Sequence, residues 1–106
     1  MKIYVAGHRG MAGSATVRSL KKLGYTEIIT ATRSELDLLN QQAVKNFIAT
    51  QKPDVLIIAA AKVGGILANN DFPYEFLMEN LIIETNLIQA AVENNIEKVI
   101  FLGSSC

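Results

Sequence analysis

The sequence has little of what would mark an extracellular, metal-binding or nucleic-acid-binding protein. It holds one cysteine, Cys106, so no internal disulfide can form and a reducing compartment is expected. Its only histidine, His8, has no partner histidine or cysteine pair, so we predict no metal site. Ten basic and ten acidic side chains cancel. This balance leaves no positive excess that would attract nucleic acid or an anionic membrane surface.

Long hydrophobic runs are missing as well. The longest apolar run, residues 55–61, is far too short to span a bilayer. The N-terminus leads directly into a short apolar run and then glycines, without the hydrophobic region of a signal peptide. Half of the residues are nevertheless hydrophobic, which is enough to form a buried core. We therefore expect at most one domain, soluble and cytoplasmic.

Short apolar runs alternate with longer helical patterns, which is typical of a parallel sheet covered by helices. The expected strands are residues 3–6, 27–31, 55–59 and 98–102, and the expected helices are residues 11–23, 40–51 and 73–94. In the first helix, Ala12, Ala15, Leu20 and Leu23 form the expected apolar stripe. The pattern predicts an α/β, Rossmann-type, doubly wound parallel sheet, truncated to four strands in the order 3-2-1-4.

Three glycines, Gly7, Gly10 and Gly13, follow the first expected strand directly and open the first helix. A tight strand-to-helix turn, close approach of backbone to a pyrophosphate, and close helix–strand packing each favour a residue without a Cβ. The helix N-terminus then offers N–H groups to the phosphates. This context favours nucleotide binding over a turn that merely connects two elements, although the spacing is G-x-x-G-x-x-G rather than G-x-G-x-x-G.

The end of the second expected strand indicates which nucleotide is bound. Proteins of this class that use NAD usually carry an acidic residue there, whereas this sequence has Arg33. A guanidinium matches a 2′-phosphate in geometry and charge, so Arg33 favours NADP. Glu35 and Asp37 follow closely and leave NAD open, as does the interpretation of Arg33 as a solvated loop residue. In the glycine loop, Arg9 is a second candidate for phosphate pairing, and His8 is interpreted as solvent-facing.

Four blocks together resemble the GDP-L-fucose synthase family of the extended short-chain dehydrogenases/reductases. They are GHRGMAGS at 7–14, TRSELDL at 32–38, AAAKVGGI at 59–66 followed by ANN at 68–70, and FLGSSC at 101–106. The resemblance implies that residues 1–106 are the N-terminal part of an NADP-binding domain, with the substrate domain absent. It also implies a homodimer that converts GDP-4-keto-6-deoxy-D-mannose to GDP-L-fucose, by epimerisation at C3 and C5 and reduction by NADPH at C4.

Two alternatives to this activity stay open: another extended short-chain dehydrogenase/reductase acting on nucleotide sugars, and a stand-alone nucleotide-binding module. The Tyr-x-x-x-Lys pair of the family is missing, because none of Tyr4, Tyr25 and Tyr74 is followed four residues later by lysine. A positioned proton donor is worth roughly 10²–10⁴-fold in rate. We therefore expect the chain alone to be inactive.

The resemblance also assigns residues to the site. The cofactor contacts that it implies are Gly7, His8, Arg9, Gly10, Met11, Ala12 and Gly13, then Arg33, Ser34, Glu35, Leu36, Asp37 and Leu38, then Leu102, Gly103, Ser104 and Ser105. Ser104 would hydrogen-bond the 4-keto oxygen, and Cys106 would act as acid or base in the epimerisation. Without the resemblance, Ser104 is simply part of a Ser-Ser turn, and Cys106 is a terminal thiol.

Asn80 and Asn86 lie six residues apart in the third expected helix. They match a helix pattern of the extended class. They are equally well interpreted as polar positions that face solvent or a neighbouring loop.

Overall fold

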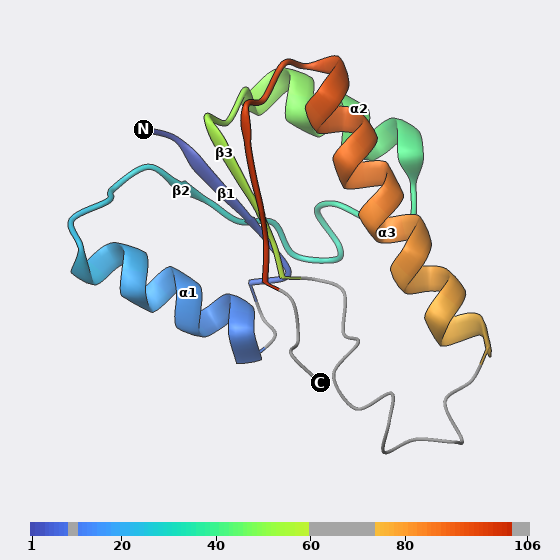
Figure 1. Ribbon diagram of the computed structural model, residues 1–106, viewed down its shortest axis with the longest axis horizontal. Helices are drawn as coiled ribbons and strands as arrows, with labels where there is room; N and C mark the ends of the chain where they lie inside the picture. The colour runs from blue at the N-terminus through green and yellow to red at the C-terminus, as the bar shows by residue number, and fades with distance from the viewer. Residues whose placement is uncertain (9–10, 60–73, 103–106) are drawn as a thin grey trace.

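The computed structural model describes residues 1–8, 11–59 and 74–102 (Figure 1). Its elements in chain order are β1 (Ile3–Ala6), α1 (Met11–Lys22), β2 (Ile28–Ile29), α2 (Gln41–Gln51), β3 (Val55–Ile58), α3 (Tyr74–Glu93) and β4 (Lys98–Phe101). Every expected strand and helix is present, and each end lies within two residues of its predicted position.

The strands form one sheet in which every neighbouring pair is parallel, which confirms the predicted parallel α/β fold. The predicted strand order 3-2-1-4 is wrong, because the observed order is β2-β1-β3-β4. β2 pairs through only two half-buried residues, Ile28 and Ile29, which suits an edge. β3 is buried along its whole length and pairs with β1 on one side and β4 on the other. A strand that is apolar on both faces belongs inside a parallel sheet, so β3 takes the internal position that the prediction gave to β2.

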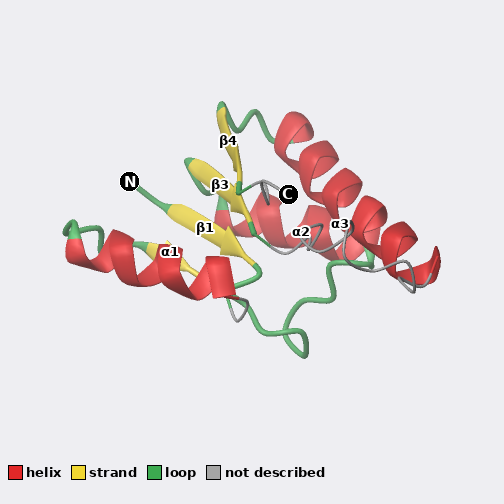
Figure 2. Cartoon of the chain, turned by 60° about the horizontal axis from the view of Figure 1, so that its bottom comes forward, coloured by secondary structure: helices red, strands yellow, loops and turns green. Residues whose placement is uncertain are grey.

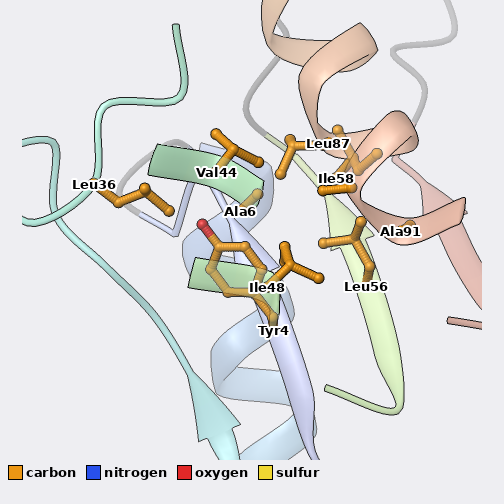
Figure 3. Close-up of a cluster of buried hydrophobic side chains, with 10 residues drawn as sticks. Tyr4, Ala6, Leu36, Val44, Ile48, Leu56, Ile58, Leu87 and Ala91 are labelled. Atoms are coloured by element: carbon orange, nitrogen blue, oxygen red, sulfur yellow. The ribbon is translucent and has the colours of Figure 1, made fainter. Parts of the chain in front are cut away.

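The side chains of β1 and β3 alternate between two separate cores. One core lies on the α2 and α3 side (Figure 3) and contains Tyr4, Ala6, Leu36, Val44, Ile48, Leu56, Ile58, Leu87, Ala90 and Ala91. The other lies on the α1 side and contains Ile3, Val5, Val55 and Ile57, against which Val17 and Leu20 pack. Figure 2 shows α1 on one face of the sheet and α2 with α3 on the other. The fold is therefore doubly wound, as predicted.

The first helix contacts the sheet through a different face from the one that the sequence predicts. Ala12, Ala15 and Leu23 are exposed, and only Leu20 of the predicted stripe packs on the core. The inward positions are 13, 17 and 20, and the buried residue among them is a glycine. Because Gly13 has no side chain, the spacing of apolar side chains does not reveal a contact face that begins there.

The second helix ends as its sequence predicts. Asn40 caps its N-terminus, where the side-chain Oδ1 accepts a hydrogen bond from the Ala43 N–H at 3.1 Å. Lys52 ends it in a left-handed conformation with φ of 49° and donates its N–H to the Ile48 carbonyl. Pro53 follows directly, so the chain cannot continue as a helix.

Candidate functional site

The sheet has a topological switch point between β1 and β3. These two strands are neighbours, but β1 leads through α1 to β2 on one side, whereas β3 leads through α3 to β4 on the other. The connections that leave the two carboxyl ends therefore diverge, and ligands of open α/β sheets bind at such a point. In Figure 1 the carboxyl ends of β1, β3 and β4 come together, with the first turn of α1 beside them.

Two of the three predicted glycines form a close contact at this end of the sheet. Gly7 directly follows β1 and has φ of 86°, a conformation that side chains disfavour. A Cβ on Gly13 would overlap the Gly7 carbonyl oxygen and lie 2.7 Å from its carbonyl carbon. The first turn of α1 thus lies against the strand end at a distance that only glycine allows. Such a helix start provides the free N–H groups and partial positive charge that a phosphate needs.

The rest of the predicted glycine loop is described only in part. Arg9 and Gly10 lie outside the described residues, as does the side chain of Met11. His8 is half-buried and Ala12 is exposed. The backbone approach of Gly13 to Gly7 therefore carries the structural case for a nucleotide at this loop.

The turn that follows β2 is held by a reciprocal pair of hydrogen bonds. The Thr32 N–H donates to Oε1 of Glu35 at 2.8 Å, and the Glu35 N–H donates back to Oγ1 of Thr32 at 3.3 Å. The Leu36 N–H also donates to the Thr32 carbonyl, at 2.8 Å. This is the hydrogen-bonding pattern of a capping box. Its T-x-x-E signature is present in the sequence, although the reasoning from sequence did not use it.

Asp37 also bonds to the backbone of its own turn. Its Oδ1 accepts a hydrogen bond from the Leu39 N–H at 3.0 Å, and its carbonyl accepts one from the Asn40 N–H at 3.0 Å. Both acidic residues that left NAD open thus contribute a carboxylate oxygen to the turn itself. Arg33 is exposed, and no ion pair joins it to another residue in the described part of the chain.

The same turn is fixed to the body of the domain by apolar packing and by a hydrogen bond. Leu36 is 6% exposed and belongs to the core on the α2 and α3 side. The Leu38 carbonyl accepts a hydrogen bond from Nδ2 of Asn86 at 2.9 Å. Asn86 is therefore a buried residue of α3 that faces a neighbouring loop, one of the two interpretations left open above. The side chain of Asn80 lies outside the described residues.

The end of β4 brings Leu102 to the switch point. Its N–H donates to the Ile58 carbonyl at 3.1 Å, and its side chain packs on the core of the α1 side. The predicted residues Gly103, Ser104, Ser105 and Cys106 lie outside the described residues, so the catalytic assignments stay predictions.

Residues 1–8, 11–59 and 74–102 contain no group of three or more His, Cys, Asp or Glu side chains arranged to hold a metal ion. Within the same described part, no helix is long and apolar enough to cross a membrane.

A parallel sheet with a glycine turn and a helix N-terminus at its switch point defines a nucleotide-binding domain of the Rossmann type. The chain belongs to the NAD dependent epimerase/dehydratase family, whose model matches residues 3–106. This membership agrees with the family resemblance of the sequence.

Individual relatives carry names of GDP-sugar enzymes. The chain is 54% identical over 105 residues to the putative GDP-L-fucose synthase 2 of Arabidopsis thaliana, with 99% of this chain and 32% of the relative covered. It is 50% identical over 105 residues to the GDP-L-fucose synthase of Escherichia coli, with coverages of 99% and 33%. Among solved structures, a GDP-mannoheptose C4 reductase of Campylobacter jejuni with NADP bound has a TM-score of 0.84 and 43% identity, over 94% of this chain and 32% of that one. The chain thus spans about a third of the length of these relatives.

Proposed function

We propose that the chain is the cofactor-binding part of an NADPH-dependent epimerase/reductase that converts GDP-4-keto-6-deoxy-D-mannose to GDP-L-fucose. Nucleotide binding follows from one observation, the approach of α1 to the carboxyl end of β1 at Gly13 and Gly7, which a Cβ would block. The choice of sugar nucleotide rests on the identity of about half with two GDP-L-fucose synthases over nearly the whole chain.

The described residues would hold the two ends of the cofactor's ADP portion. The backbone at Gly7 and the first turn of α1 would accept the pyrophosphate, since neither presents a Cβ at the point of contact. The exposed guanidinium of Arg33 would pair with the 2′-phosphate. When bound, NADPH supplies the hydride for reduction at C4.

The two proposed catalytic groups rest on the family resemblance. The hydroxyl of Ser104 would donate a hydrogen bond to the 4-keto oxygen and so stabilise the negative charge that develops there. Sγ of Cys106 would take or give a proton at C3 and C5. An ordinary thiol has a pKa of about 8.5, close enough to neutrality for either role.

The resemblance also leads us to propose a homodimer, and the composition leads us to propose a cytoplasmic location. Exposed apolar side chains on α3, including Leu81 and Val92, support the first of these proposals.

A GDP-sugar reductase that acts at C4 and does not epimerise its substrate is the second candidate, because the Campylobacter jejuni structure is described as a GDP-mannoheptose C4 reductase. The product separates the two candidates. The longest polypeptide that the gene encodes is incubated with NADPH and GDP-4-keto-6-deoxy-D-mannose in deuterated water. GDP-L-fucose with deuterium at C3 and C5 supports the first candidate, and a reduced sugar without deuterium at these carbons supports the second.

The cofactor choice is tested with Arg33→Ala in the chain, titrated with NADPH and NADH by calorimetry. Hydrogen bonds to a charged group contribute enough for an expected loss of NADPH affinity of about tenfold to a hundredfold. NADH lacks the 2′-phosphate, so its affinity should hardly change. Arg18→Ala, which removes an exposed arginine from α1, is the matched control and should leave both affinities unchanged. An unaltered NADPH/NADH ratio in Arg33→Ala would reject the assignment.

A further inference from the structure

Asn86 is a polar side chain in an apolar part of α3. It is 5% exposed, and the next residue, Leu87, and the later Ala90 and Ala91 are fully or almost fully buried in the core. A buried amide costs free energy unless its polar atoms find partners. An apolar residue at this position would avoid this cost, so the hydrogen bond made by Asn86 has to offset it.

The partner of this hydrogen bond is the turn that carries Arg33. Nδ2 of Asn86 donates to the Leu38 carbonyl at 2.9 Å, across 48 residues of sequence. The other hydrogen bonds given above for residues 32–40 are local, from Thr32 to Glu35 and from Asp37 to Asn40. They shape the turn but do not attach it to the domain. The buried side chain of Leu36, the partly buried side chain of Leu38 and the amide of Asn86 attach it.

The docking of α3 does not depend on Asn86. Nε2 of Gln41 in α2 donates to Oε1 of Gln89 in α3 at 2.7 Å, and Lys45 forms an ion pair with Glu93 at 3.5 Å. The buried Leu87 adds apolar contact on the same side. Loss of the Asn86 amide should therefore release the turn without displacing the helix.

We propose that Asn86 is a positioning residue for the cofactor. By holding the Leu38 carbonyl, it fixes the far end of residues 33–38, so that Arg33 is presented to the 2′-phosphate in one arrangement. A turn that is already ordered loses less conformational entropy on binding, which raises affinity without a new contact. This inference rests on the proposed function, because it needs a cofactor with a 2′-phosphate.

The test compares two probes that differ in that phosphate, adenosine 2′,5′-bisphosphate and ADP. The chain and its Asn86→Leu variant are titrated with each, and the amide exchange of Leu39 and Asn40 is followed by NMR. Asn86→Leu should weaken the bisphosphate by about three- to tenfold and ADP by less than twofold, in line with the loss of one hydrogen bond. Exchange at the two amides should become faster, while exchange within α2 and α3 should not change.

The matched control is Asn94→Leu. Nδ2 of Asn94 also donates to a backbone carbonyl, that of Ala90 at 2.8 Å, but this carbonyl belongs to its own helix. The control should leave both probes unaffected. If Asn86→Leu does not fold, Asn86→Ala removes the donor without adding bulk and is compared in the same way.

Four results would overturn the proposal. Equal weakening of both probes, or faster exchange throughout α2 and α3, would mean that Asn86 has only a structural role. A preference for the bisphosphate that Asn86→Leu leaves unchanged would reject the positioning role alone. A wild-type chain that binds both probes equally would overturn the NADP preference and this inference together, and it is recognised before any substitution is made.

Discussion

On the α2 and α3 side of the sheet, Tyr4, Ala6, Leu56 and Ile58 are covered by two helices, whereas α1 is the one helix of the described residues that covers the alternate strand residues on the other side. The two-helix side also buries side chains of the helices themselves, and these are Val44, Ile48, Leu87, Ala90 and Ala91. On the one-helix side, Val17 and Leu20 are only partly buried. The same two strands therefore support cores of unequal depth, with two helices on one face of the sheet and α1 on the other (Figure 2).

The two sides of the sheet contribute differently, one mainly to stability and the other to the candidate nucleotide site. Apolar burial is the main favourable term in folding, so the two-helix side should supply most of the stability. On the one-helix side, the buried residue among the described side chains of α1 is Gly13, whose contact with Gly7 builds the candidate nucleotide site. The position of α1 is thus fixed by a backbone approach at its first turn as much as by its apolar side chains.

Tyr4 shows how closely the two-helix side is packed. Its ring lies 4.9 Å from that of Phe47, measured between centroids, at an interplanar angle of 52°. Burial raises the pKa of the Tyr4 hydroxyl above its ordinary value. Tyr4 is thus a core residue, with both its ring and its hydroxyl buried.

Two adjacent isoleucines of β3 provide the strongest test of whether the two cores differ in depth. Ile58 is 1% exposed and faces α2 and α3, whereas Ile57 is 6% exposed and faces α1. Ile58→Ala should lower the free energy of unfolding by about 4 kcal/mol and Ile57→Ala by about 2 kcal/mol, because a shallower site relaxes more easily around a cavity. Urea unfolding of the chain measures both losses. Equal losses would show that the two cores have the same depth.

The two sides of the sheet also differ in how much of their structure the sequence could predict. α2 and α3 carry apolar side chains at helical spacing, so their bounds followed from local patterns to within one residue. The inward face of α1 was mispredicted because its closest contact is made by Gly13, which has no side chain to detect. The strand order was missed because it followed the usual Rossmann order, whereas the short β2, which pairs through two residues, lies at the edge of this sheet.

The candidate site also has features that the sequence could predict and one that it could not. The glycine spacing and Arg33 were visible because they are local patterns with a known physical purpose, and the Thr32–Glu35 pair carries a readable signature as well. The bond from Asn86 to Leu38 joins residues 48 positions apart. It depends on how α3 packs beside the turn, which no local pattern determines.

Replacing Gly13 by alanine should lower the free energy of unfolding less than Ile58→Ala does. It should affect NADPH binding more. The added Cβ would overlap the Gly7 carbonyl, so α1 must move away from the end of β1. Overpacking of this kind costs about 1–3 kcal/mol, less than the loss expected for Ile58→Ala. The displacement falls on the proposed pyrophosphate site, so NADPH binding by the chain should be lost, as measured by calorimetry beside urea unfolding.

The control for this prediction is Gly24→Ala at the other end of α1. Gly24 has φ of 95° and nothing within 4 Å of an added Cβ, so alanine there is strained but meets no neighbour. A left-handed conformation costs a non-glycine residue about 1–2 kcal/mol, which makes the two variants similar in stability. If NADPH binding follows stability, both variants should lose it to the same extent. If it follows the contact between α1 and β1, Gly13→Ala should lose binding while Gly24→Ala keeps it, and we expect this second result because only Gly13 touches the turn that follows β1.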